Sequence, residues 1–140
     1  EEGYTTHLIA AEACKVIETG DRSKPLFLYV PFNGVHSPFQ VPDQYLKPYG
    51  DLKGNRQKLA GMLAAVDEGI GQVVEALEKS GQRENTIILF SADNGGPPPG
   101  TNTPLRDFKG SIFEGGVRAA AFARPFGSRP PVAAATPRSR

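Results

Sequence analysis

Residues 54–90 read GNRQKLAGMLAAVDEGIGQVVEALEKSGQRENTIILF, a long amphipathic segment that leads into a short apolar one. In the first part, the apolar side chains recur at steps of three, one and four residues, which places them on one stripe of a helix. Gly81 is suited to end that helix. Residues 86–90, Thr-Ile-Ile-Leu-Phe, are typical of a strand that is buried on both faces. The stretch therefore predicts a long helix followed by a buried strand.

The flanking segments extend this pattern. Residues 26–30, Leu-Phe-Leu-Tyr-Val, predict an earlier buried strand, so the middle of the chain reads strand, helix, strand. Residues 5–19 predict an amphipathic helix, residues 31–48 a loop with one helical turn after Pro42, and residues 117–123 a third strand. Because a right-handed crossover is the usual connection, we expect the first two strands to pair in parallel. The sequence predicts an α/β fold with a mostly parallel sheet flanked by helices, incomplete in this chain.

Composition limits the class of protein. The chain has 140 residues, 39% apolar and 22% charged, which fits one modest domain or a piece of a larger one. It begins at Glu1, without Met or a signal peptide, and is interpreted as a fragment. A single cysteine, Cys14, cannot form an internal disulfide and is expected to be a small buried hydrophobe. No apolar run approaches the roughly 18 residues of a membrane span.

The C-terminal end differs from the rest. Residues 124–140 carry four arginines, four prolines and no acid, without periodicity, and predict a disordered tail after a domain of residues 1–123. The overall net charge is +1, and nothing in the charge pattern indicates a nucleic-acid surface.

Two polar clusters follow the predicted strands at their carboxyl ends, where open parallel sheets place their binding crevices. The first is residues 34–38, Gly-Val-His-Ser-Pro, and the second is residues 93–96, Asp-Asn-Gly-Gly. Asp93 and Asn94 offer hard oxygen ligands of the kind that Ca²⁺ or Mg²⁺ prefers, although two residues cannot fill a shell of about 6 to 8 oxygens. The dipeptide alone is also compatible with a simple Asn-Gly turn.

Three further side chains could act on an anionic substrate. His36 could donate a proton to a leaving group or bind an anionic oxygen. Lys109 and Arg118 lie in glycine-punctuated stretches from which a cation could reach an oxyanion. Taken alone, the histidine is also compatible with a surface or capping group, and the two cations with solvated loop charges.

Three segments together are more specific than any one of them. KPLFLYVPFNGVHSPFQVPDQYLKPY, NTIILFSADNGG and LRDFKGSIFEGGVR occur in an order and at spacings that resemble arylsulfatases. The likeness is to the B type (N-acetylgalactosamine-4-sulfatase-like), within the alkaline phosphatase superfamily, and covers nearly all of residues 4–123. It implies an alkaline-phosphatase-like fold and sulfate ester hydrolysis with a divalent metal, usually Ca²⁺.

The resemblance also implies roles for single residues. Asp93 and Asn94 match metal ligands of the family. His36 matches a histidine that contacts sulfate and assists the leaving oxygen, and Lys109 matches a sulfate-binding lysine, so both are predicted catalytic and substrate-binding residues. These assignments agree with the charges, because a metal, a lysine and an acidic imidazole suit a sulfate ester whose bridging oxygen gains negative charge.

Departures from the family pattern are equally specific. The nucleophile implied by the resemblance is a formylglycine made in a C/S-x-P/A-x-R motif, and neither Cys14 nor any serine stands in such a motif. An Asp pair that completes the metal site in relatives has no match. Asp107 stands where relatives more often have glycine. We therefore expect this polypeptide alone neither to bind metal tightly nor to turn over substrate.

Three interpretations remain open at this point: a sulfatase fragment, a phosphodiesterase or phosphonate hydrolase of the same superfamily, and a non-catalytic remnant that keeps the fold. The substrate could be an aryl sulfate or a sulfated sugar. By resemblance, the location would be secreted, periplasmic or lysosomal. Exposed sheet edges and faces predict that the isolated chain aggregates or is partly unfolded.

Overall fold

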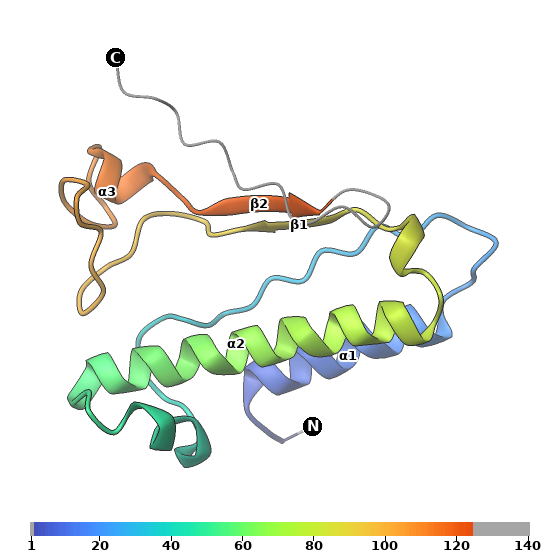
Figure 1. Ribbon diagram of the computed structural model, residues 1–140, viewed down its shortest axis with the longest axis horizontal. Coiled ribbons are helices and arrows are strands. Elements are labelled where there is room, and N and C mark those ends of the chain that lie inside the picture. The colour runs from blue at the N-terminus through green and yellow to red at the C-terminus, as the bar shows by residue number, and fades with distance from the viewer. Residues whose placement is uncertain (1, 125–140) are drawn as a thin grey trace. The chain divides into compact units, whose positions relative to one another are not determined.

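A computed structural model of the chain describes residues 2–124, and Figure 1 shows its elements. The chain divides into two compact units, Glu1–Arg83 and Glu84–Arg140, which are described separately. The first contains α1 (Thr5–Thr19), the short 3₁₀ turns η1 (Asp43–Tyr45) and η2 (Lys47–Tyr49), and α2 (Gly54–Lys79); a third turn, η3 (Arg83–Asn85), follows α2. The second contains β1 (Ile88–Ser91), α3 (Glu114–Val117) and β2 (Ala121–Arg124).

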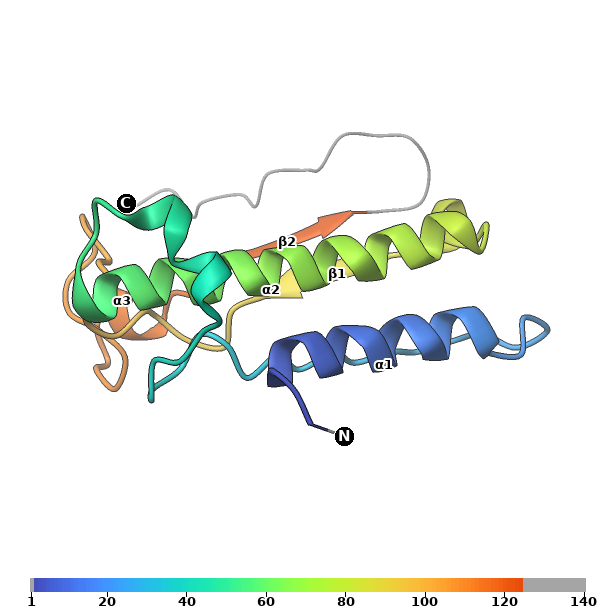
Figure 2. The ribbon, with the colours of Figure 1, turned by 90° about the horizontal axis from the view of Figure 1, so that it is seen from below.

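The core of the first unit lies between its two long helices, which run side by side in Figures 1 and 2. Both helices begin and end within a residue or two of the predicted bounds, because their apolar stripes are local features of the sequence. Gly69 of α2 allows the close approach: a Cβ there would lie 3.2 Å from that of Ala10. The buried apolar residues are Ala10, Ala13 and Ile17 of α1, Tyr45 of η1, and Met62, Ala65, Val66, Ala76 and Leu77 of α2.

A series of side-chain hydrogen bonds joins three elements of this unit. The Tyr45 hydroxyl donates to Glu68 Oε2 at 2.8 Å and lies 2.8 Å from His7 Nε2. Since the hydroxyl hydrogen goes to the carboxylate, His7 Nε2 is the donor of the second bond. Burial, followed by the hydrogen bond to Glu68, raises the pKa of Tyr45. The predicted helical turn after Pro42 is confirmed, and this tyrosine fixes it between α1 and α2.

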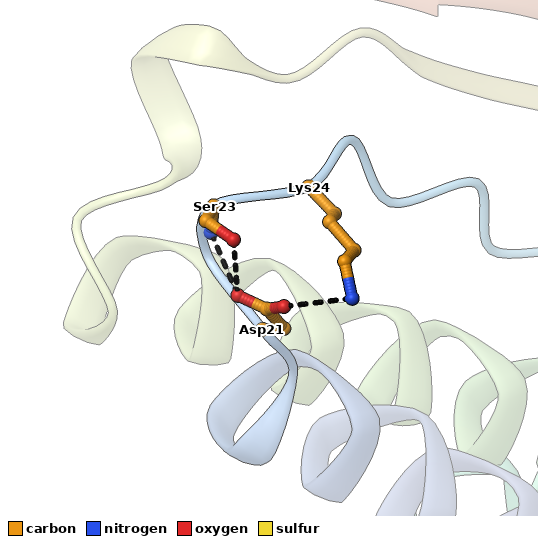
Figure 3. Close-up of polar contacts among 3 residues, drawn as sticks. All are labelled: Asp21, Ser23 and Lys24. Atoms are coloured by element: carbon orange, nitrogen blue, oxygen red, sulfur yellow. Dashed lines mark hydrogen bonds and ion pairs between the residues drawn. The ribbon is translucent and has the colours of Figure 1, made fainter.

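A tight turn leads the chain out of α1 (Figure 3). Asp21 Oδ1 accepts hydrogen bonds from the backbone N–H of Ser23 at 3.0 Å and from its hydroxyl at 2.7 Å, while Oδ2 lies 3.1 Å from Lys24 Nζ. The hydrogen bonds from Ser23, and then that from Lys24, lower the pKa of Asp21. This is the side-chain turn that an Asp-x-Ser sequence favours.

The predicted strand at residues 26–30 is not formed. No residue of this segment has a strand assignment, and Phe27 and Tyr29 are 93% and 76% exposed. A strand requires a hydrogen-bonded neighbour, and the described sheet has only the two strands β1 and β2. The predicted parallel pairing with residues 86–90 is therefore corrected: β1 pairs with β2, and the pair is antiparallel.

The sheet of the second unit is small. Ile88 pairs with Arg124 and Ser91 with Ala121, and the rings of Phe90 and Phe122 stack at 4.8 Å between centroids. β1 covers residues 88–90 of the predicted second strand and continues to Ser91. β2 covers residues 121–123 of the predicted third strand and continues to Arg124, which the sequence assigned to the tail, while residues 117–120 are not in a strand. The remainder of that tail lies outside the described residues.

Cys14 was expected to be buried and is only half-buried on α1, where burial raises the pKa of its thiol. Neither long helix of residues 2–124 is apolar over enough of its length to cross a lipid bilayer.

Candidate functional site

The segment that follows β1 is fixed at both ends by backbone hydrogen bonds. Ala92 N–H donates to Ala120 O at 2.8 Å, and Gly95 N–H donates to Gly116 O at 2.9 Å. A Cβ on Gly95 would overlap the Gly115 carbonyl, so only glycine permits this approach. The turn thus presents Asp93, which is exposed, and Asn94, which is half-buried, from a backbone that is held on either side.

The Lys109 segment is joined to this turn. Lys109 N–H donates to Gly96 O at 3.4 Å, and the Gly115 N–H donates to Arg106 O at 2.8 Å. The Arg106 guanidinium lies over the ring of Phe113, 3.5 Å from its centroid, as in a cation–π contact. The Lys109 ammonium is on an exposed side chain, so its charge remains available to an anion.

Asp107 occupies a backbone conformation that favours glycine. Its φ is 71°, in the left-handed region, where aspartate is one of the better tolerated side chains. The Oδ1 atom of Asp107 also accepts the Phe108 N–H at 3.1 Å. The left-handed backbone therefore suits the glycine that the resemblance leads us to expect at this position, and it also tolerates aspartate.

The side chain of Asn102, which sequence reasoning missed, lies at the centre of these segments. Its Nδ2 donates to Gly96 O, Asp107 O and Gly115 O at 2.8, 3.0 and 2.9 Å, and its Oδ1 accepts the Gly96 N–H at 3.2 Å. Its acceptors lie up to 13 residues away along the chain. An asparagine in a loop rich in glycine and proline gave no signal of such a role.

His36 belongs to the first unit. Its Nδ1 lies 2.8 Å from the carbonyl oxygen of Ser37, and because a carbonyl only accepts, Nδ1 carries a hydrogen. The proton that can be gained or lost is therefore on Nε2. His36 lines an open cavity of about 410 Å³, together with Asn33 and Gln40 of the same loop, Tyr4 before α1, and Met62 of α2.

Of the four predicted site residues, the structure brings three into one unit: Asp93, Asn94 and Lys109 all belong to residues 84–140. His36 is placed in the other unit, against the cavity just described. Arg118 is partly buried, and its Nη1 lies 3.6 Å from Glu114 Oε1 within α3 and its cap, so it is engaged with its own helix.

The Asp93 turn offers oxygen ligands of the kind that a hard cation prefers, but too few of them to fill its coordination shell. Asp93 offers a carboxylate and Asn94 an amide oxygen, both of which Ca²⁺ accepts. Across residues 2–124, no group of three or more His, Cys, Asp or Glu side chains is placed to hold a metal ion. The turn offers two oxygen ligands of the kind that a calcium shell needs, and the metal site stays a prediction.

Comparison with known proteins identifies the family. The sulfatase family model matches residues 1–139. The chain belongs to the sulfatase family. Arylsulfatase J of Mus musculus is 43% identical over 122 residues, and the sulfatase YdeN of Escherichia coli is 34% identical over 131 residues. The matches cover 85% and 86% of this chain, but only 20% and 23% of those proteins.

Solved sulfatase structures confirm the fold class. The crystal structure of Ps i-CgsB in complex with k-i-k-neocarrahexaose matches with a TM-score of 0.81 and 39% identity, over 85% of this chain and 27% of that one. The sulfatase chain described here is thus part of an α/β, alkaline-phosphatase-like fold. It spans about a fifth to a quarter of the length of its relatives.

Proposed function

We propose that this chain supplies metal-binding and sulfate-binding residues to a sulfuric ester hydrolase. The observation that carries the proposal is the joined backbone of the Asp93 turn and the Lys109 segment, through the bond from Lys109 N–H to Gly96 O, in a chain that matches the sulfatase family. This arrangement supports a paired role, in which oxygen ligands and an ammonium group serve one oxyanion.

The chemistry follows from the charges of these side chains. Asp93 and Asn94 would hold a divalent cation, for which Ca²⁺ is the proposed choice. When bound, such a cation supplies positive charge that stabilises the sulfate oxygens during attack at sulfur. Lys109 neutralises a non-bridging sulfate oxygen with a charge-assisted hydrogen bond. None of these residues is a nucleophile, and the formylglycine that sulfatases use has no counterpart motif in this sequence.

His36 is the proposed general acid. With Nδ1 bonded to Ser37 O, a protonated ring presents Nε2–H as its second donor, and this proton passes to the bridging oxygen as the S–O bond breaks. The proton neutralises the negative charge that develops on that oxygen, and the leaving group departs as an alcohol.

A sulfated sugar is the proposed substrate class, in preference to an aryl sulfate. The crystallised Ps i-CgsB was bound to k-i-k-neocarrahexaose, and the N-acetylgalactosamine-6-sulfatase of Mus musculus, 30% identical over 129 residues, is named for a sulfated sugar.

A chimeric enzyme tests the proposal. In arylsulfatase J of Mus musculus, the matching segment of 122 residues is replaced by that of this chain. We expect hydrolysis of sulfated sugars, and a loss of about a hundredfold or more in kcat/KM when Asp93 or Lys109 is changed to alanine. Asp67→Ala and Lys58→Ala, on the exposed surface of α2, are matched controls that should retain activity.

The other interpretations predict different results. A folded chimera without any hydrolytic activity would support the non-catalytic remnant. A chimera that prefers phosphate esters to the matched sulfate esters would support the phosphodiesterase. Either result would contradict the proposed function.

A further inference from the structure

We propose that Asn102 is a positioning residue: one side chain holds the Asp93–Gly96 turn, the Lys109 segment and the start of α3 in a fixed relation. The inference rests on the proposed function for its purpose, since it concerns the same metal-binding and sulfate-binding residues. Its physical content, the coupling of three backbone segments, stands on contacts within the second unit.

The hydrogen bonds of Asn102 use nearly all of its capacity. The amide group carries two hydrogens, and three carbonyls lie within 3.0 Å of Nδ2, so at least one hydrogen is shared. The Oδ1 atom accepts the N–H of Gly96, whose carbonyl accepts from Nδ2. Both backbone polar groups of Gly96, its N–H and its carbonyl, are therefore held by one side chain.

The segments that Asn102 joins are the ones that carry the proposed site. Gly96 follows Asn94 by two residues, and its carbonyl also accepts the N–H of Lys109. Asp107 O is the second anchor, two residues before Lys109. Gly115 O is the third, and the Cβ that Gly95 lacks would overlap that same carbonyl.

The segments that carry the proposed site have little regular secondary structure to hold them in place. Besides the end of η3, the described part of the second unit has two short strands and one four-residue helix, and the backbone bonds within the loop between β1 and α3 are local turns apart from that of Lys109 N–H to Gly96 O. Loops without a regular ladder of backbone hydrogen bonds unfold locally with little cost in free energy. A side chain that bridges three backbone segments restricts such opening at the Asp93–Gly96 turn and at the Lys109 segment.

The substitution Asn102→Leu tests this inference in the full chain, because leucine has nearly the same shape and none of the four hydrogen bonds. Asn102→Asp is a second variant of the same size, which keeps the acceptor for Gly96 N–H but turns a carboxylate oxygen toward three carbonyl oxygens. Asn55→Leu, at an exposed position in the first turn of α2, is the matched control.

Amide hydrogen exchange is the first readout. The reporters are Gly95, Lys109 and Gly115, whose N–H groups bond to backbone acceptors and not to Asn102 itself. We expect all three to exchange at least about tenfold faster in Asn102→Leu, with a common change at least as large in Asn102→Asp. Amides of α2, such as that of Met62, should not change. Faster exchange at only one segment, or at none, would overturn the inference.

Calcium chloride is the second probe, with binding followed at the Asp93 and Asn94 amide resonances. We expect a weak response in the wild-type chain and one at least about fivefold weaker in Asn102→Leu, since the ligand pair is no longer preorganised. Faster exchange at all three amides of Asn102→Leu, with an unchanged calcium affinity, would overturn the positioning role. A wild-type chain without any calcium response would count against the proposed metal site, while the exchange data would still decide whether Asn102 couples the segments.

Discussion

Gly95 and Asn102 illustrate how single residues build the second unit. Gly95 can approach the Gly115 carbonyl because it lacks a Cβ, and Asn102 bonds to the carbonyls that this approach brings together. The glycines were visible in the sequence as turn residues, whereas the role of Asn102 was not, because its partners are backbone atoms and not side chains of a recognisable type.

Substitution of Gly95 by alanine should therefore weaken the second unit. The added Cβ overlaps the Gly115 carbonyl, and overpacking of this kind costs about 1–3 kcal/mol. Faster amide exchange at Ala92 would report the loss. Gly71→Ala is the control: nothing lies within 4 Å of the added atom on α2, so the better helix former should stabilise the first unit by up to about 1 kcal/mol. Equal effects of the two changes would contradict this account.

The Asp21 turn makes a prediction about pH. Because its pKa is lowered in the folded chain, Asp21 contributes stability above its ordinary value of 3.8, and this contribution is lost as the pH falls through the lowered pKa. Ser23→Ala removes the largest cause, the hydroxyl hydrogen bond. A carboxyl titration followed by NMR should then show a higher pKa for Asp21, and an unchanged value would refute the assignment.

At the level of elements, the two long helices were predictable and the first strand was not. A helix bonds to itself, so the apolar stripe of α2 and the glycine that ends it, Gly81, are local signals. Residues 26–30 have the composition of a buried strand, but a strand depends on neighbours that the segment cannot specify. His36 was expected to lie beyond the carboxyl end of that strand, which is not formed, and the role of His36 stays a prediction.

Tyr45 provides the test of how the helices are tied together. Tyr45→Phe removes the bond to Glu68 and the acceptor for His7, at a cost of about 1–2 kcal/mol in the free energy of unfolding. Urea denaturation followed by circular dichroism measures the change. Tyr29→Phe, on a ring that is 76% exposed, should have little effect, and a similar loss in both variants would argue against the Tyr45 tie.

The same tyrosine predicts an alkaline effect. Its raised pKa means that its contribution to stability is fully present below the ordinary value of 10.0 and is lost as the pH rises through the higher folded pKa. Denaturation midpoints across this range should fall more steeply for the wild-type chain than for Tyr45→Phe. Parallel pH profiles would show that Tyr45 does not carry the effect.

On the scale of the whole molecule, large apolar side chains are exposed in both units: Phe27 and Tyr29 in the first, Leu89 and Ile112 in the second. Exposed apolar surface of this extent favours association. We expect light scattering to show concentration-dependent oligomers of the isolated chain, reduced by Phe27→Lys. A monomeric chain with a cooperative thermal transition would contradict the expectation drawn from the sequence.

The family and the fold class followed from three short segments, because their order and spacing are carried by the whole chain and do not depend on any one pairing of strands. The site assignments rest on the same segments and stay predictions. The structure adds that Asp93, Asn94 and Lys109 lie on backbone joined through Gly96, an arrangement for which spacing alone gave no geometry.

A crystal structure of the chimeric sulfatase with calcium and sulfate would test the central claim most directly. We predict a cation bound through the Asp93 carboxylate and the Asn94 amide oxygen, with the sulfate ion against Lys109 Nζ. A cation and a sulfate ion bound elsewhere, with these three side chains in solvent, would contradict it.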